Sequence, residues 1–328
     1  MPKGRQAGAS PGPMGVSVRH RAQRARYRRL RTNRRGLVAV VGTLLSLLVF
    51  LSLFGTFLTF YLPLWMADDE ANFTAGVSTS LAELQSNMQL QAETGNPPVL
   101  STPFTMSSDS VPLLSVPTTG TLAFLPRTPG ASVSLSIPNF LTANTPYKQT
   151  FGGSLGTMLI TLPNRYYSPE TFQLEDGAII QSEGDTNQLI SFPPIFILQK
   201  IGTSLSLTMM LTQMYGNATR LTSPGTIEVY SELLGATQTL KNNNTGAVAS
   251  LFLNVTTHYP CAWSTFFTQS RTVGNVSAAQ MTVTYSAGYT PCTATSGQAK
   301  TINVLITNIA TVTLILANFQ LSAGIGVV

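Results

Sequence analysis

The stretch from Leu37 to Met66 reads LVAVVGTLLSLLVFLSLFGTFLTFYLPLWM and contains no Asp, Glu, Lys, Arg or His. As a helix it would be about 45 Å long, whereas about 20 residues are enough to cross the hydrocarbon core of a bilayer. Buried helices of soluble proteins rarely contain an apolar run longer than about 14 residues. The sequence therefore predicts a transmembrane helix at 37–66.

The charges on the two sides of this segment differ in sign. Residues 1–36 hold 11 of the 19 Lys and Arg residues and no acidic residue, whereas Asp68, Asp69 and Glu70 follow the segment. Basic residues next to a span stay in the cytoplasm, which predicts a single-pass protein with a cytoplasmic N-terminus and an extracellular C-terminal part. Pro63 cannot donate a hydrogen bond to the carbonyl of Thr59, so we expect a kink near the outer interface.

The remainder of the chain, from Leu37 onward, has 8 basic and 13 acidic residues and is weakly acidic. Such a chain offers no positive face to phosphates, so the composition argues against a nucleic-acid partner despite an overall charge of +6. The sequence also has no phosphate loop, no dinucleotide fingerprint and no paired-histidine metal motif. We expect no cofactor, no metal and no small-molecule substrate.

The junction Arg34-Arg35-Gly36-Leu37 stands directly before the apolar run. It resembles the class III signal peptide of archaeal type IV pilin-like proteins, in which a basic pair and a Gly precede the cut and the apolar helix is retained. The resemblance implies that a prepilin-type signal peptidase removes residues 1–36 and leaves Leu37 as the new N-terminus. Gly42 then matches a Gly that is common early in such helices.

Beyond the predicted span, apolar residues recur at the helical spacing of three and four: Phe73, Val77, Leu81, Leu84 and Met88. This pattern predicts that the helix continues through 67–94 with one apolar face. The face would pack on the protein's own outer domain, as in a pilin spine. A stalk or a dimeric coiled coil is the alternative, although only about three heptads are available.

Residues 95–120 carry five prolines and read as an extended connector, and residues 121–328 read as a β-rich extracellular domain. Ten short runs bounded by Pro, Gly and Asn predict strands, with no convincing helix among them: 121–125, 131–137, 157–162, 178–181, 203–214, 226–233, 248–257, 280–286, 301–306 and 311–321. The predicted fold class is therefore α+β, a long N-terminal helix followed by an antiparallel sandwich-like domain. The uncharged C-terminus from Ile302 contains too many Asn and Thr residues for a second span.

Ordered motifs within 34–200 resemble a family of archaeal pilin-like surface proteins of unassigned function. They are Gly153-Ser-Leu, Asn164-Arg-Tyr-Tyr167, Leu174-Glu-Asp-Gly-Ala-Ile-Ile180, Glu183-Gly-Asp185 and Pro193-Pro-Ile195. The carboxylates Glu175, Asp176, Glu183 and Asp185 could gather a Ca²⁺ ion, but no EF-hand spacing is present. We expect them to be solvated turn residues instead.

One catalytic pattern is present. Gly152-Gly-Ser154-Leu-Gly156 fits G-x-S-x-G, and Asp176 or Asp185 followed by His258 gives the chain order of a hydrolase. A nucleophile elbow needs a buried strand before the Ser and a helix after it, whereas residues 157–162 read as a strand. We therefore expect no catalytic residues and no enzyme activity.

The two cysteines, Cys261 and Cys292, lie on the exterior side and are predicted to form a disulfide. Five Asn-x-Ser/Thr sequons are candidates for N-glycosylation on that side, and they begin at Asn72, Asn217, Asn243, Asn254 and Asn275. Glycans would hydrate a surface that has few charges.

Two functions fit these features. The first is a pilin-like subunit or accessory component of an archaeal type IV filament, whose partners are membrane lipid, the signal peptidase and other pilin-like subunits bound through the N-terminal helix. The 228 residues beyond position 100 favour a minor component over one repeated thousands of times. The alternative is an uncleaved, signal-anchored and glycosylated surface protein for adhesion or envelope structure.

Overall fold

The computed structural model describes residues 17–95, 98–109, 116–126, 132–142, 145–151, 156–183, 187–242, 249–285, 292 and 299–325. The chain divides into two compact units, 1–63 and 64–328. Helical hydrogen bonding is continuous through α1 (Ser17–Thr56), the π-helical turn η1 (Phe57–Tyr61) and α2 (Leu62–Thr94). The predicted end of the helix near residue 94 is confirmed. The change from α to π pairing lies directly before Pro63, which lacks the N–H that regular α pairing requires.

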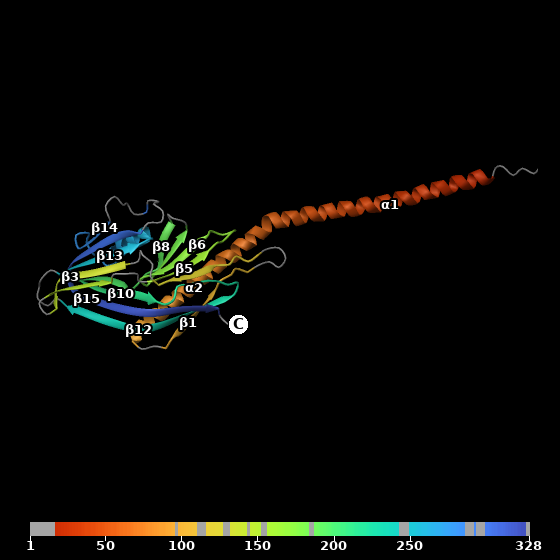
Figure 1. The fold of residues 1–328 in the computed structure, drawn as a ribbon. Coiled ribbons are helices and arrows are strands. Elements are labelled where there is room, and N and C mark those ends of the chain that lie inside the picture. The colour runs from red at the N-terminus through yellow and green to blue at the C-terminus, as the bar shows by residue number, and fades with distance from the viewer. Residues whose placement is uncertain are drawn as a thin grey trace, which may run out of the picture. The chain divides into compact units, whose positions relative to one another are not determined.

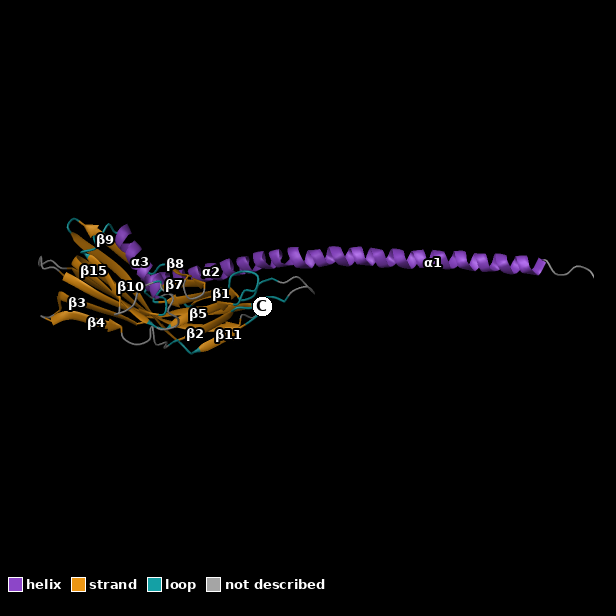
Figure 2. Cartoon of the chain, turned by 90° about the horizontal axis from the view of Figure 1, so that it is seen from above, coloured by secondary structure: helices purple, strands orange, loops and turns teal. Residues whose placement is uncertain are grey.

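The second unit contains two sheets (Figures 1 and 2). The six-stranded sheet has the order β11-β2-β5-β6-β7-β8 and all its pairs are antiparallel. Its strands are β2 (Thr121–Leu125), β5 (Thr157–Leu162), β6 (Glu170–Glu175), β7 (Ala178–Glu183), β8 (Asn187–Phe192) and β11 (Thr219–Thr222). The nine-stranded sheet contains β1 (Leu100–Thr105), β3 (Ser132–Thr142), β4 (Thr145–Phe151), β9 (Phe196–Ile201), β10 (Ser204–Tyr215), β12 (Thr226–Asn242), β13 (Ala249–Thr257), β14 (Met281–Tyr285) and β15 (Lys300–Ile325).

The C-terminal strand β15 organises the larger sheet. It pairs with β13 and then β12 along one edge, and with β14 and then β10 along the other. The expectation that this segment is a strand and not a second span is confirmed, although the two predicted strands 301–306 and 311–321 are one. The predicted α+β class, a long N-terminal helix followed by a β domain, is confirmed. The β10–β15 pair is parallel, so the larger sheet is mixed, whereas the smaller sheet is antiparallel throughout as predicted.

Two apolar cores share strands of both sheets. The first core lies around the short helix α3 (Pro260–Val273) and includes Leu207 and Leu211 of β10. The second core lies around α2 and includes Met210 and Met214 of the same strand. Successive side chains of a strand point to opposite faces, so β10 is buried on both faces and separates the two cores.

The apolar face of α2 packs as predicted. Phe73, Val77, Leu81, Leu84 and Met88 are all buried, and Leu84 is fully inaccessible. They lie in one cluster with side chains from strands of both sheets, among them β1, β2, β5, β6, β7, β10, β12 and β15. The helix is therefore part of the interior of the domain, and a free stalk or coiled coil over 67–94 is excluded.

Helix α3 corrects the expectation of a helix-free β domain. Pro260 occupies its first turn, where a missing N–H costs no hydrogen bond, and Ala262, Trp263 and Phe267 supply a buried face at helical spacing. The connector also differs in part from the expectation, because residues 100–105 form β1. This strand pairs only with β12 among the described strands, and an edge position tolerates Pro103.

If the second core depends on α2, replacing both Leu81 and Leu84 by Asp should destabilise the unit 64–328 by several kcal/mol, because two carboxylates would be buried without partners. We expect a fall in melting temperature of roughly 10 °C or more in a fragment beginning at Leu64. Leu90→Asp is the matched control, since Leu90 lies on the exposed face of the same helix. Equal melting temperatures for the double variant and the control would contradict the docking.

Candidate functional site: the docked and exposed parts of the N-terminal helix

A buried carboxylate fixes the first turns of α2 to the β domain. Glu70 is inaccessible to solvent, and its oxygens accept hydrogen bonds from the backbone N–H groups of Arg165 (3.0 and 2.9 Å), Tyr166 (2.7 Å) and Tyr167 (2.8 Å). The hydroxyl of Thr118 donates another. Three consecutive amides form an anion-binding nest between β5 and β6.

The balance of burial and hydrogen bonding sets the charge of Glu70. Burial raises its pKa, but the hydrogen bonds from Thr118 and from the three backbone amides lower it more, so the pKa lies below the ordinary value of 4.5. The carboxylate therefore stays ionised inside the domain. A charged acceptor with this many donors contributes more to stability than a neutral hydrogen bond does.

Two glutamines continue the same contact along α2. The amide nitrogen of Gln85 donates to the carbonyl oxygens of Gly177 (2.6 Å) and Pro193 (3.0 Å). The amide nitrogen of Gln91 donates to the carbonyl oxygens of Pro98 (3.0 Å) and Ser231 (2.9 Å). Each glutamine thus satisfies backbone carbonyl groups of the domain that lie far from it in the chain or in a different element.

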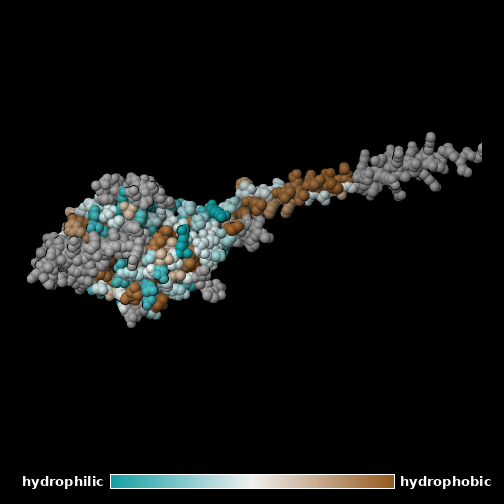
Figure 3. Space-filling model, in the orientation of Figure 1, coloured by the Kyte–Doolittle hydropathy of each residue, from teal (hydrophilic) through white to brown (hydrophobic). Residues whose placement is uncertain are grey.

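The part of the helix before α2 is different in character. From Gly36 to Thr56 every side chain is exposed, including Leu37 (69%) and Leu48 (67%). Figure 3 shows this apolar stretch in brown, in contrast to the pale or teal colours of most of the domain surface that is visible there. Among the described residues, only the helix Gly36–Thr94 is long and apolar enough to cross a membrane.

The predicted cleavage junction lies within α1. Arg34, Arg35, Gly36 and Leu37 are all helical, and Gly36 and Leu37 are exposed. A side chain added at Gly36 or at Gly42 would meet no atom within 4 Å. Neither glycine is therefore required by packing within the chain.

The turn Asp176–Gly177 between β6 and β7 corrects the expectation of solvated carboxylates. Glu175 and Asp176 are buried (2% and 5% exposed), and only Glu183 of the described carboxylates in this group is exposed. Asp185 lies outside the described residues. Asp176 accepts a hydrogen bond from the backbone N–H of Thr212 (3.2 Å), and a side chain at Gly177 would clash with the same threonine. The hairpin tip therefore docks on β10, between the two cores.

The buried carboxyls favour the protonated form. Burial raises the pKa of Glu175 to about 7, although hydrogen bonds to its carboxylate lower it. The amide nitrogen of Gln173 donates one of these hydrogen bonds to Oε2 of Glu175 (2.8 Å). Burial raises the pKa of Asp176 well above its ordinary value, and it raises that of Tyr259 to about 12 with a contribution from Glu175.

The predicted disulfide is confirmed. Cys261 in the first turn of α3 is bonded to Cys292, with the two Cα atoms 4.7 Å apart. The bond ties the start of α3 to the chain that follows β14. It closes a loop that contains α3 and β14, both of which supply side chains to the first core.

The five sequons lie in different settings. Asn72 is exposed on α2, Asn217 is exposed after β10, and Asn275 is exposed just after α3. Asn254 is half-buried in β13, opposite Asn303 of β15. Asn243 lies outside the described residues. Their glycosylation stays a prediction.

The residues of the hydrolase pattern give no support to a nucleophile elbow. Ser154 lies outside the described residues, and residues 157–162 form β5 and not the helix that the elbow requires. His258 is exposed at the end of β13, whereas Asp176 is buried. Within the described part of the chain, no three His, Cys, Asp or Glu side chains gather to hold a metal ion.

No family model matches the chain, and neither the curated proteins nor the solved structures include a significant match. Membership of the family that the motifs resemble therefore stays a prediction. The architecture itself, an N-terminal hydrophobic helix followed by a β domain, resembles that of pilin-like proteins.

The sequence indicates the apolar stripe of α2 but not the roles of Glu70, Gln85 and Gln91, because their partners are backbone groups distant in the chain.

The carboxyls predict a bell-shaped dependence of stability on pH. Glu70 has a lowered pKa, so its contribution is present above pH 4.5 and is lost as the pH falls through the folded value. Glu175 has a raised pKa, so its contribution is complete below pH 4.5 and is lost as the pH rises toward 7, and Asp176 acts in the same direction. For Glu175 the loss is on the order of 3 kcal/mol.

Urea unfolding of the unit 64–328 between pH 3 and pH 8 measures this dependence. Glu175→Gln should keep more of its stability at pH 7.5 than the wild type does, whereas Glu70→Gln should lose stability mainly above pH 4.5. Glu83→Gln, at an exposed position of α2, is the control and should follow the wild type. A wild-type curve that does not fall between pH 5 and pH 7.5 would show that Glu175 is not held in a protonated state.

The disulfide predicts a separate loss. Replacing both cysteines by Ala should lower the free energy of unfolding by about 3–4 kcal/mol, because the unfolded chain regains the entropy of a closed loop with ends 31 residues apart. The free energy of unfolding of the wild type is compared with that of the double variant at one pH, and both proteins are taken from the fraction that the cells export. Labelling of both thiols in the unreduced, denatured wild type would contradict the bond.

Proposed function

We propose that this protein is a pilin-like subunit or accessory component of an archaeal type IV filament system. Residues 37–66 hold it in the membrane, the leader 1–36 stays in the cytoplasm, and the β domain faces the exterior. A prepilin-type signal peptidase removes the leader after Gly36, and the freed helix then exchanges lipid for the helices of neighbouring subunits. The protein has no catalytic role.

The division of one helix into two parts carries this proposal. The first part is wholly apolar and exposed, and the second is amphipathic and buried on one face inside the β domain. An ordinary signal anchor needs only the first part, because a flexible linker can join an anchor to its domain. A filament subunit needs both, since the domain must be fixed to the helix through which it assembles.

The motifs that resemble archaeal pilin-like proteins give independent support. Arg165, Tyr166 and Tyr167 supply the amides around Glu70, and Gly177 and Pro193 supply the carbonyls that bind Gln85. Three of the quoted motifs thus supply backbone groups that hold α2. The size of the domain favours a minor or tip component, because a subunit repeated along a whole filament must fit between close neighbours.

The mature protein is expected to begin at Leu37, and intact-mass or N-terminal analysis of native protein measures this. Gly36→Val should block processing, whereas Gly42→Val should leave it unchanged. Neither substitution meets a neighbouring atom in the chain, so a difference between them reports recognition by the peptidase and not misfolding.

A mature protein that retains Met1 or Pro2 would contradict the proposal and favour the uncleaved, signal-anchored surface protein. Cleavage after Gly36 alone does not establish a filament role. The proposal also requires that the processed protein appear in appendages sheared from cells. The Gly36→Val variant, which keeps its leader, should be absent from that fraction and remain in the membrane.

A further inference from the structure

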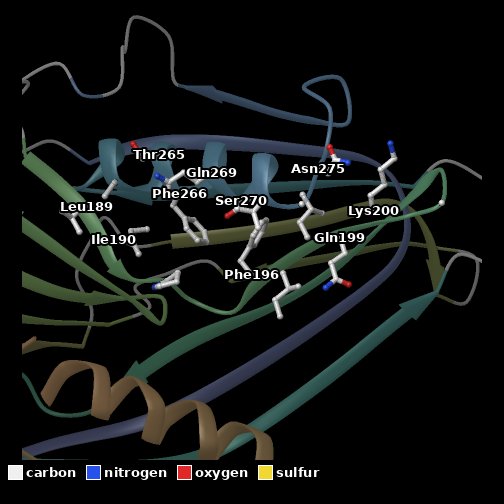
Figure 4. A pocket seen from close by; sticks show the side chains of 17 residues that line it. Leu189, Ile190, Phe196, Gln199, Lys200, Thr265, Phe266, Gln269, Ser270 and Asn275 are labelled. Atoms are coloured by element: carbon white, nitrogen blue, oxygen red, sulfur yellow. The ribbon is translucent and has the colours of Figure 1, made fainter. Parts of the chain in front are cut away.

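A groove of about 1180 Å³ lies between α3 and the strands β8 and β9 (Figure 4). Its base is aromatic, because the rings of Phe196 and Phe266 meet edge to face with centroids 5.8 Å apart. Apolar side chains along it are open to solvent, among them Leu189 (47%), Ile197 (49%) and Val273 (87%). Groups of this kind are costly to leave uncovered on an exported protein.

The rim of the groove is polar but almost uncharged. The side chains of Gln199, Gln269, Thr265 and Ser270 offer amides and hydroxyls, and Lys200 is the one charged residue among those that line it. Aromatic faces beneath amide and hydroxyl groups suit an uncharged polyhydroxyl chain. The C–H faces of sugar rings pack on the aromatic rings, and their hydroxyls bond the amides.

One end of the groove is formed by the turn after α3, where the backbone packs closely on β9 and a sequon begins. Gly274, after α3, approaches β9 so closely that a Cβ there would lie 2.4 Å from the carbonyl oxygen of Leu198. The next residue, Asn275, takes a left-handed conformation with φ of 51°. Figure 4 shows its side chain at the same end as Lys200, with Leu189 and Ile190 at the other.

Asn275 begins the sequon Asn275-Val276-Ser277. Both Asn275 and Ser277 are exposed while Val276 is buried, so the two groups that a transferase must reach face outward from an anchored turn. Asn254, by contrast, is half-buried within β13 and pairs on both sides, with β3 and β15.

We propose that Asn275 carries an N-linked glycan whose first sugars lie in the groove between α3, β8 and β9. The glycan covers the apolar side chains and shields the strand edges, since β8 pairs only with β7 and β9 only with β10 among the described strands. The inference rests on the proposed function to the extent that the domain must face the exterior.

The attachment is a transfer from a phosphate-activated, lipid-linked sugar donor. The side-chain nitrogen of Asn275 forms a bond to the anomeric carbon, and the bond from that carbon to the phosphate oxygen breaks. The lipid phosphate leaves with the electron pair, and the proton that the amide nitrogen gives up passes to water.

The test uses full-length protein from its native cells, as wild type and as the variants Ser277→Ala, Asn275→Asp and Ser277→Thr. The first two remove the sequon in different ways, and Asp tolerates the left-handed conformation at position 275. Ser277→Thr keeps the sequon and is the matched control. Asn217→Gln removes the exposed sequon after β10, which does not line the groove.

Mass spectrometry of peptides should find sugar on Asn275 in the wild type, in Ser277→Thr and in Asn217→Gln, with complete loss in the other two variants. Hydrogen exchange should show faster exchange of Phe196–Ile201 amides in those two variants only. A glycan on Asn275 without a change in exchange would overturn its packing in the groove.

A bare Asn275 would overturn the proposal. If Asn217 then carries sugar, or if Cys261 and Cys292 are oxidised, the exterior location still holds and only this inference falls. Free thiols together with no glycan at any sequon would instead overturn the exterior location, and with it the proposed function. A bare Asn275 with groove amides protected in sheared appendages would identify a protein partner as the occupant.

Discussion

The burial of one face of α2 between the two sheets is the interaction on which the rest of the domain depends. Phe172 of β6, Leu122 of β2 and Phe319 of β15 come from both sheets and meet in the core that the helix completes. Without the helix these side chains would face water, and the loss of their burial would remove a large part of the driving force for folding. The helix from Leu64 onward and the β domain are therefore one folding unit.

Polar groups on the buried face decide the register of this packing. An apolar stripe alone tolerates a shift along the helix axis, because one turn later another set of apolar residues meets the sheets. Such a shift would take the carboxylate of Glu70 away from the amides of Arg165, Tyr166 and Tyr167 and leave a buried charge without partners. The cost of that state far exceeds the small differences between alternative apolar contacts, so the domain is locked at one position on the helix.

The sequence predicts features that repeat and misses features that depend on distant partners. The stripe Phe73–Met88 and the strands 121–125 and 157–162 follow from periodicity, and the structure confirms them. Helix α3 was missed although Ala262, Trp263, Phe266 and Phe267 have helical spacing, because its Thr and aromatic residues have modest helix propensity. The Asp176–Gly177 turn was correctly predicted as a turn, but its burial depends on Thr212, and nothing near residue 176 indicates that contact.

The same contacts bear on the proposed function, in which one helix serves two environments. In that proposal, leaving lipid for the helices of a filament replaces one apolar environment by another, so the exposed residues of 37–56 would change neighbours at little cost. The docked residues cannot, because each departure from the domain would expose the second core and break the hydrogen bonds of Glu70, Gln85 and Gln91. The proposed assembly would therefore change the contacts of the apolar part while the domain keeps its structure. The step from exposed to buried residues along the helix would then separate the part that changes partners from the part that does not.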